Sequence, residues 1–353
     1  MSREIVHLID AQTPRDMLDQ MWAVREAQER VVSLGPPPAY RRLGEVRIES
    51  LHCPMGVKGW AWRRLAKRLP ADAIVHVWSR DLLPPACRAA QCVGGGVVCS
   101  LPHLPAGAAL EQMPWELGQF GHCLTIPTAR AREELIQRCA DARRVFVLPP
   151  AVRSFPKADS RDGDAVREAL GFSPDEVVIL LPAEMLRGAG HDWASWAHAI
   201  CREVQDRGRL IIPGRHPREP RVRFFANTTG FGHEAIFTGD EFSREELLAA
   251  ADVAAFLYER DLGVTALAEA MAAGVAILAT TTPDVMEICE NETTALLAQP
   301  GSPRSAAAAM LRLIEDADLR RRLGKAGRAH AEEHFRRTAV RTRLERIYAT
   351  FGA

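Results

Sequence analysis

Short apolar runs rich in β-branched residues alternate along this chain with longer segments of helical periodicity. Ile5–Ile9, Ala73–Val77 and Gly96–Ser100 are runs of the first kind, and Gly59–Leu69 is a segment of the second. This alternation is typical of parallel α/β folds. Strands that are apolar along their whole length need cover on both faces, as helices provide in a doubly wound sheet. The sequence therefore predicts the α/β class with doubly wound, Rossmann-like sheets.

A polar, turn-rich stretch over residues 154–164 interrupts the alternation, which then starts again. We expect it to link an N-terminal domain (1–153) to a C-terminal domain (165–334), because 353 residues exceed one typical core. Residues 335–353 have the pattern of a charged amphipathic helix, which we expect to pack across the domain junction. Two such domains would face a central cleft, where ligands usually bind.

The pattern also predicts individual elements. In the first half we expect a long helix over Pro14–Ser33, followed by a strand over Val46–Ser50. The strands expected in the second half are Val177–Leu181, Arg209–Ile212, Ala235–Thr238, Val253–Leu257 and Val275–Ala279.

Charge and cysteine usage exclude several classes of partner. Lys+Arg and Asp+Glu are balanced at 45 each, and no reader motif is present, so we expect no nucleic-acid partner. The eight cysteines are scattered without zinc-like spacing, which predicts no metal site and reduced thiols in a cytoplasmic protein. The amino terminus lacks the apolar region of a signal peptide, and no apolar run approaches the ~20 residues of a membrane span.

The segment Lys58–Arg68 is basic and aromatic, KGWAWRRLAKR. Basic amphipathic helices can lie on anionic lipid. Trp60, Ala61 and Leu65 have helical spacing, however, and such residues more often pack into a core. Core packing is therefore favoured over peripheral membrane contact.

One segment, Asp261–Pro300, carries several ordered features. Asp261 precedes a turn with Gly263, a second acid follows eight positions on at Glu269, and Met271–Gly274 lead out of a helix into a strand. This order resembles the donor-site signature of retaining group 1 (family 4) glycosyltransferases. The resemblance implies the GT-B architecture and transfer of a sugar from a nucleotide diphosphate sugar, with retention and without a metal ion or cofactor. The acceptor stays open among a glycan, a lipid-linked molecule and a small molecule.

The proposed donor site also has a physical rationale. A glycine-containing turn that opens a helix near Thr265 presents free N–H groups to a diphosphate. Glu269, one turn further on, could accept hydrogen bonds from the vicinal hydroxyls of a ribose; the alternative is an exposed helix acid. The donor-binding residues that we expect are Leu262, Gly263, Val264, Thr265, Ala266, Glu269, Gly214 and Thr238.

Three residues are candidates for catalysis. By resemblance, Asp261 would face the donor sugar, where the family has Glu, although a helix-capping role is an equal alternative. His103, in the loop after the strand Gly96–Ser100, would touch the transferred sugar, or is merely exposed. Arg187 is the third, because the family's Arg and Lys positions hold Glu184 and Ala189 here.

These departures leave more than one function open. The glycine-rich loop that the family has after the first strand is also missing, and the chain has Ala11–Arg15 there. Loss of charge-assisted contacts to a leaving group would cost ~3–4 kcal/mol each. The alternatives to an enzyme of hexosyltransferase type are a catalytically decayed module that binds nucleotide sugars, and another activity on the same scaffold, such as an epimerase.

Overall fold

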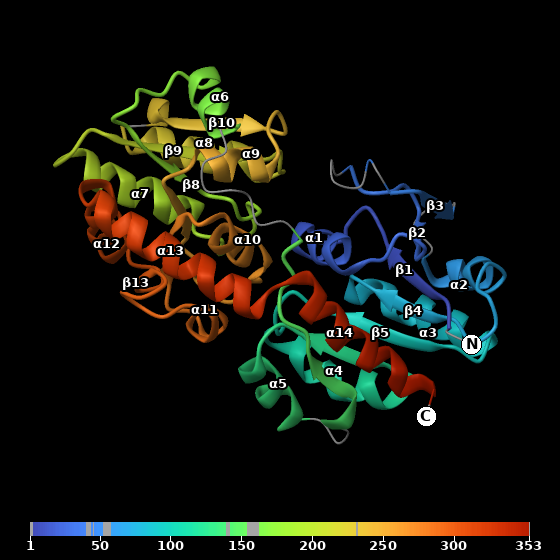
Figure 1. The fold of residues 1–353 in the computed structure, drawn as a ribbon. Helices are drawn as coiled ribbons and strands as arrows, with labels where there is room; N and C mark the ends of the chain where they lie inside the picture. The colour runs from blue at the N-terminus through green and yellow to red at the C-terminus, as the bar shows by residue number, and fades with distance from the viewer. Residues whose placement is uncertain are drawn as a thin grey trace. The chain divides into compact units, whose positions relative to one another are not determined.

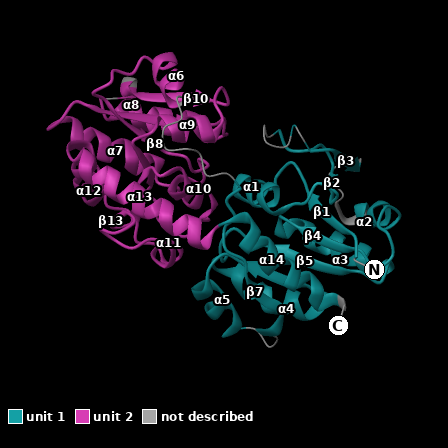
Figure 2. Cartoon of the chain, viewed as in Figure 1, with its two compact units in different colours: residues 1–153, 336–353 teal, residues 154–335 magenta. Residues whose placement is uncertain are grey.

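The computed structural model describes residues 3–39, 44, 46–51, 58–138, 142–153, 162–230 and 232–352. They form two compact units, one of residues 1–153 with 336–353 and the other of residues 154–335 (Figure 2). The chain thus returns to the first unit at its end, and the segment predicted to pack across a junction is counted with that unit. Most of the predicted linker, residues 154–161, lies outside the described residues.

A parallel sheet forms the first unit (Figure 1). Its described strands, in sheet order, are β3 (Ile48–Leu51), β2 (Arg30–Leu34), β1 (Ile5–Ile9), β4 (Ile74–Val77), β5 (Gly96–Ser100), β6 (Cys123–Ile126) and β7 (Val145–Val147). Its described α-helices are α1 (Arg15–Val24), α2 (Lys58–Ala66), α3 (Leu83–Cys92), α4 (Ala108–Phe120), α5 (Ala129–Ile136) and α14 (Arg337–Ala349).

The helix predicted over Pro14–Ser33 is wrong in its second half. Helix α1 ends at Val24, because Arg25 adopts an extended backbone. The residues Arg30–Leu34 instead form β2, which pairs in parallel with β1. Val31 and Val32 are β-branched and fully buried within that strand, which is the environment that favours the extended form.

A second parallel sheet forms the other unit. Its described strands, in sheet order, are β10 (Ala235–Gly239), β9 (Gly208–Pro213), β8 (Val177–Leu180), β11 (Val253–Phe256), β12 (Ala276–Thr280) and β13 (Leu296–Ala298). Its described α-helices are α6 (Asp162–Ala169), α7 (His191–Arg202), α8 (Glu219–Thr228), α9 (Arg244–Ala250), α10 (Thr265–Ala273), α11 (Pro283–Ile288), α12 (Pro303–Glu315) and α13 (Ala317–His334). Both sheets are doubly wound, as predicted.

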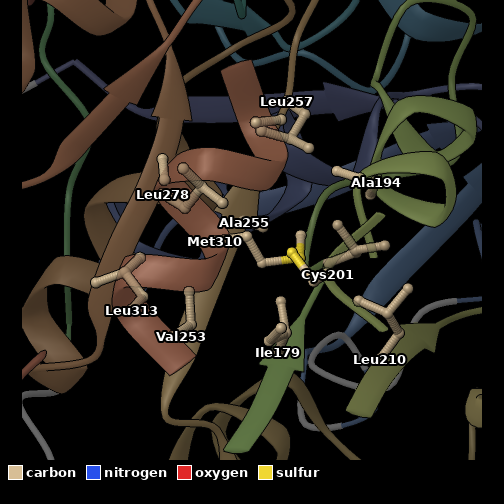
Figure 3. Packing of buried hydrophobic residues seen from close by; sticks show 14 of the residues in the cluster. Ile179, Ala194, Cys201, Leu210, Val253, Ala255, Leu257, Leu278, Met310 and Leu313 are labelled. Atoms are coloured by element: carbon tan, nitrogen blue, oxygen red, sulfur yellow. The ribbon is translucent and has the colours of Figure 1, made fainter. Parts of the chain in front are cut away.

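Helices α7, α8 and α12 cover one face of the second sheet. Alternate residues of the central strands, such as Ile179 on β8 and Ala255 on β11, point to this face and pack against Ala194 and Cys201 of α7 and Met310 of α12 (Figure 3). Right-handed connections place α9 and α10 on the opposite face, because the chain reverses its direction across the sheet after β10. At the carboxyl edge of the sheet, α7 and α8 therefore begin on one face, and α9 and α10 begin on the other.

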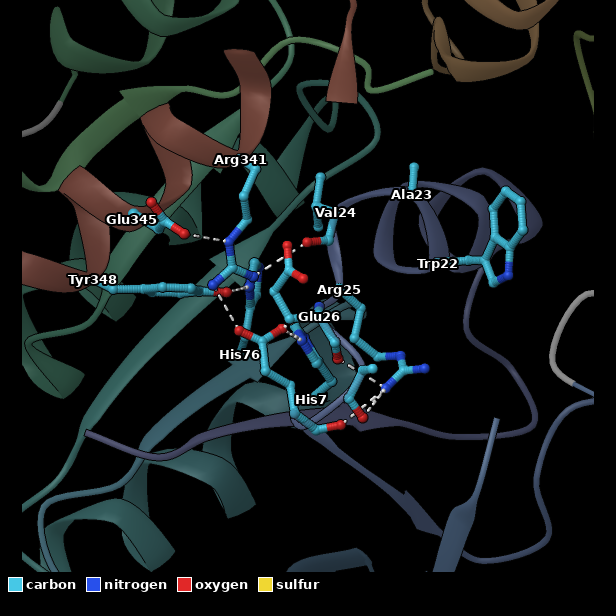
Figure 4. A network of polar contacts seen from close by, with 12 residues as sticks. His7, Trp22, Ala23, Val24, Arg25, Glu26, His76, Arg341, Glu345 and Tyr348 are labelled. Atoms are coloured by element: carbon cyan, nitrogen blue, oxygen red, sulfur yellow. Dashed lines mark hydrogen bonds and ion pairs between the residues drawn. The ribbon is translucent and has the colours of Figure 1, made fainter. Parts of the chain in front are cut away.

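A buried polar network ties α14 to the sheet of the first unit (Figure 4). Arg341 on α14 contacts the Glu29 carboxylate at 2.7 Å, and the other oxygen of Glu29 lies 2.9 Å from His7 Nε2. His76 on β4 is hydrogen-bonded to the hydroxyl of Tyr348 at 2.7 Å. All five side chains are largely or fully buried, so the carboxyl-terminal helix is held by charged and polar contacts as well as by apolar packing.

Candidate functional site

The strand order of the second sheet reverses between β8 and β11, and ligands of open α/β sheets bind beside the carboxyl ends of strands at such a switch point. The loops that follow these two strands contact each other. The N–H of Glu259 donates to the Gly188 carbonyl at 2.9 Å. Gly190 has a φ of +80°, and a Cβ there would lie 1.9 Å from the Leu257 carbonyl oxygen. Only glycine fits this close approach, which fixes the loop before α7.

Helix α10 begins at this switch point, as the sequence predicts. Gly263 has a φ of +115°, which turns the chain into the helix, and Val264 precedes its first residue. No described side chain caps this end of α10. The first N–H groups of the helix are therefore available to an anion. The predicted residues Thr265 and Ala266 are buried in the first turn, and Leu262 is half-buried before it.

Glu269 lies on α10 about one turn inside the helix and is held by a cation from α9. Arg244 Nη1 donates to Glu269 Oε2 at 2.9 Å, and the two side chains are 12% and 11% exposed. Glu269 is thus an oriented, mostly buried carboxylate rather than an exposed helix acid. Arg244 was not predicted as a site residue; it directly follows the capping residue Ser243 and is the first residue of α9.

Asp261 lies in the turn before α10 but serves a different helix. Its Oδ1 accepts a hydrogen bond from the N–H of Asp284, in the first turn of α11, at 2.9 Å. A carboxylate in this position stabilises the positive end of the α11 dipole. The structure thus shows a capping contact for Asp261, to α11 rather than to the helix that follows it.

The positions expected to carry cations are occupied differently. Ala189 is buried at 4% exposure, and the Glu184 carboxylate lies 3.9 Å from His216 Nε2. Arg187 is exposed, and its carbonyl accepts a hydrogen bond from Arg260 at 3.2 Å. The side chain of Arg187 is therefore on the surface of the loop that follows β8.

Gly214 and Thr238 lie at the carboxyl ends of β9 and β10. The N–H of Gly214 donates to the Gly239 carbonyl, so the two strand ends are joined there. Thr238 lines a pocket of about 630 Å³ together with Arg215 and His216. The Thr238 hydroxyl is buried and has no hydrogen-bond partner among the described residues. This pocket borders the same carboxyl edge as the amino terminus of α10.

His103 belongs to the first unit, where it follows β5 and is half-buried. In the same unit, the turn after β1 is built without glycine. Asp10 Oδ1 accepts hydrogen bonds from the N–H of Gln12 at 3.1 Å and from the Thr13 hydroxyl at 3.0 Å. The Asp10 side chain thus closes the turn at the place where the family has a glycine-rich loop.

The described part of the chain offers neither a metal cluster nor a membrane-spanning helix. Within it, no group of three or more His, Cys, Asp or Glu side chains is arranged to hold a metal ion. Among the same residues, no helix has the length and apolarity that would let it cross a membrane. In α2, Ala61 and Leu65 are buried, as predicted for core packing, whereas the side chain of Trp60 lies outside the described residues.

Comparison with known proteins decides the family of the second unit. Residues 162–330 match the model of the family described as glycosyl transferases group 1. These residues form a group 1 glycosyl transferase domain. The domain spans α6 to α13 and so contains the α10 signature, the Glu269–Arg244 pair and both strand-end residues. The sequence-based recognition of the family is thereby confirmed.

Curated proteins are also similar to part of this chain. N-acetyl-alpha-D-glucosaminyl L-malate synthase of Bacillus anthracis is 26% identical over 189 residues, which cover 53% of this chain and 49% of that protein. This chain thus spans about half the length of the curated relatives it matches.

Solved structures match over almost the whole chain. Anabaena Alr3699/HepE in complex with UDP and glucose has a TM-score of 0.84 at 15% identity, covering 99% of this chain and 100% of that one. WaaG, a glycosyltransferase involved in lipopolysaccharide biosynthesis, has a TM-score of 0.75 at 15% identity, covering 97% and 99%. These likenesses confirm a GT-B fold built of two Rossmann-like domains.

Proposed function

We propose that this protein is a glycosyltransferase that moves a sugar, of hexosyl type, from a nucleotide diphosphate sugar to an acceptor that is still unknown. The observation that carries the proposal is the uncapped amino terminus of α10 at the switch point, with the oriented carboxylate of Glu269 one turn further on. The bound UDP and glucose of the HepE structure support a nucleotide sugar as the donor.

Each part of such a donor has a matching group at the carboxyl edge of the second sheet. The diphosphate binds the N–H groups of α10 and is approached by Arg187. The ribose hydroxyls donate to Glu269, and the base occupies the pocket that Thr238 lines, next to Gly214 at the end of β9. This assignment gives the buried Thr238 hydroxyl the partner that it lacks among the described residues.

The transfer that we propose is retaining and independent of metal. The bond between the sugar and the diphosphate breaks, the acceptor oxygen forms the new bond on the same face, and the acceptor's proton leaves with the nucleoside diphosphate. Negative charge grows on the leaving diphosphate, where helix N–H groups and Arg187 stabilise it without an ion. Asp261 and His103 are proposed to contact the transferred sugar, and no cofactor takes part.

A second candidate, a decayed module that binds the donor without turnover, is favoured by one specific observation. Glu184 and the buried Ala189 occupy the two places where cations would neutralise the diphosphate.

The described cysteines, which form no disulfide, support a cytoplasmic place of action for either candidate.

Release of nucleoside diphosphate from a panel of nucleotide sugars separates the two candidates. An active enzyme should release nucleoside diphosphate from at least one donor well above the rate of spontaneous release in buffer without protein. Binding of UDP without release from any donor would favour the decayed module. Absence of binding by every nucleoside diphosphate would overturn both.

A further inference from the structure

A second pocket, of about 570 Å³, lies between the amino-terminal halves of α7 and α8. Its walls include Trp193, Trp196, Arg218 and Phe225, and Glu259 and Arg187 border it from the loops. Helices α7 and α8 cover the face of the sheet opposite α9 and α10, which carry Arg244 and Glu269. The pocket therefore adjoins the proposed donor site through one loop but is built from different helices.

Three residues that line this pocket carry buried polar atoms without a hydrogen-bond partner among the described residues. The atoms are His191 Nε2, Asp192 Oδ1 and Arg218 Nε. The His191 side chain is only 4% exposed. Buried polar atoms are nearly always hydrogen-bonded in proteins, so three such atoms on residues that line one pocket favour a ligand there.

The chemistry of these atoms indicates what the ligand is. Burial lowers the pKa of His191 to about 4, so the ring is neutral near pH 7. A hydrogen bond to the backbone of Ala183 engages the other ring nitrogen, which leaves Nε2 as an acceptor. Asp192 Oδ1 is a second acceptor, and Arg218 Nε is a donor. Two acceptors and one donor suit hydroxyl groups, which both donate and accept. Arg187 and Arg221 add guanidinium donors to the walls and Glu259 adds a carboxylate, so the pocket offers acceptors as well as donors, whereas a phosphate would need donors alone.

The aromatic walls suit the same kind of ligand. Trp193 and Trp196 lie nearly parallel, with ring centroids 6.3 Å apart and an angle of 7° between the planes. The Trp193 indole N–H donates to Glu259 Oε1 at 2.7 Å, which fixes its ring. Trp196 is 48% exposed although it is a large apolar side chain. A fixed aromatic face beside hydrogen-bonding groups offers apolar contact to the C–H face of a ring and polar contact to its edge.

We propose that the pocket between α7 and α8 is a second binding site, which takes an uncharged, polyhydroxylated sugar ring independently of the nucleotide donor. The ring lies against Trp193 and Trp196, and its hydroxyls meet His191, Asp192 and Arg218.

Saturation-transfer NMR and calorimetry with the methyl glycosides of glucose, galactose, mannose and N-acetylglucosamine test this proposal on the full chain. At least one glycoside should bind with a Kd of about 1–10 mM, the range of a weak single-ring ligand. Trp196→Ala and Asp192→Asn should each weaken that binding about tenfold or more. Phe224→Ala is the matched control, because Phe224 is an aromatic residue of α8 that is 69% exposed and does not line the pocket.

Three results would overturn the proposal. The first is that no glycoside binds, and the second is that wild type and both pocket variants bind equally. The third is that UDP displaces the glycoside, which would assign the pocket to the donor site. The assay contains no donor, so loss of the proposed transferase activity would leave its outcome unaffected. Circular dichroism of each variant shows whether it is folded.

Discussion

Arg244 Nη1 donates a hydrogen bond to Glu269 Oε2 over 2.9 Å, and both side chains are close to nine-tenths buried. The pair joins the first residue of α9 to the middle of α10, so the carboxylate assigned to the ribose has a fixed orientation. A carboxylate that is already ordered loses little side-chain entropy when a ligand binds. The two residues therefore act together in donor binding.

Glu269→Ala should weaken the binding of UDP by about 1.5–3 kcal/mol, the range for hydrogen bonds to a charged group. Arg244→Ala should weaken it less, because the carboxylate remains but loses its orientation. Calorimetry measures both effects. Glu245→Ala is the matched control, since Glu245 is an exposed acid next to Arg244, and it should bind as wild type does. Unchanged affinity in a folded Glu269→Ala protein would refute the ribose assignment.

Arg187→Ala distinguishes an active enzyme from a decayed one. If Arg187 supplies the charge that Glu184 and Ala189 do not, its loss should lower kcat by about 10²–10³, as removal of one preorganised donor does. Initial rates of nucleoside diphosphate release measure the effect, with the exposed helix residue Arg304→Ala as the control. If kcat is unchanged in Arg187→Ala, Arg187 does not have this role, and the α10 amino terminus is the main phosphate ligand.

Much of the fold follows from local sequence, but not where an element depends on its neighbours. The apolar runs of β1, β8 and β11 were predictable because both of their faces are buried. Strand β2 was not predicted, because Met17, Met21 and Val24 have a helical spacing and the expected helix was extended to Ser33. The β-branched Val31 and Val32 are a local strand signal, whereas the pairing of β2 with β1 is a tertiary effect.

The candidate site divides in the same way. Gly263 and Glu269 were identifiable because a turn, a helix and an acid occur at fixed spacing along the chain. Arg244 and Asp284 were not, because their contacts with Glu269 and Asp261 join residues 25 and 23 positions apart. The packing of α9 against α10, and of α11 against the turn before α10, brings these groups together.

Treatment with EDTA should leave both UDP binding and turnover unchanged. Metal independence follows from the proposal that helix N–H groups and a guanidinium carry the diphosphate. Calorimetry and rate measurements with and without excess EDTA test it. Loss of binding that magnesium or manganese restores would show that a metal ion bridges the donor and the protein.

Gly190→Ala should destabilise the second unit more than Gly188→Ala. Both glycines have a positive φ, so each substitution carries backbone strain of about 1 kcal/mol. At Gly190 the new Cβ would also overlap the Leu257 carbonyl, whereas at Gly188 the nearest atom is Arg260 Nε at 3.4 Å. Overpacking against backbone adds about 1–3 kcal/mol. Thermal unfolding of the two variants measures the difference, and equal melting temperatures would contradict the close approach of the two loops.

The network around Glu29 predicts that acid destabilises the first unit. Hydrogen bonds from His7 and Arg341 outweigh the effect of burial and lower the pKa of Glu29 from 4.5 to about 2. Its stabilising contribution is therefore complete above pH 4.5 and is lost as the pH falls towards 2. Burial lowers the pKa of His7 below 6.5, so the unfolded chain takes up that proton first and stability also falls below pH 6.5.

Glu29→Gln tests this network because it removes the charge and keeps the shape. The variant leaves Arg341 buried without its main partner, so it should lower the free energy of unfolding at pH 7 by about 3–5 kcal/mol. It should also flatten the decline of stability between pH 4.5 and 2, since the titrating group is gone. Glu345→Gln is the control: Glu345 pairs with the same Arg341 at 2.9 Å but is 57% exposed, so its loss should cost less than about 1 kcal/mol. Chemical denaturation of the three proteins from pH 3 to pH 7 gives these values. A Glu29→Gln protein as stable and as acid-sensitive as wild type would show that the Glu29–Arg341 ion pair does not stabilise the packing of α14.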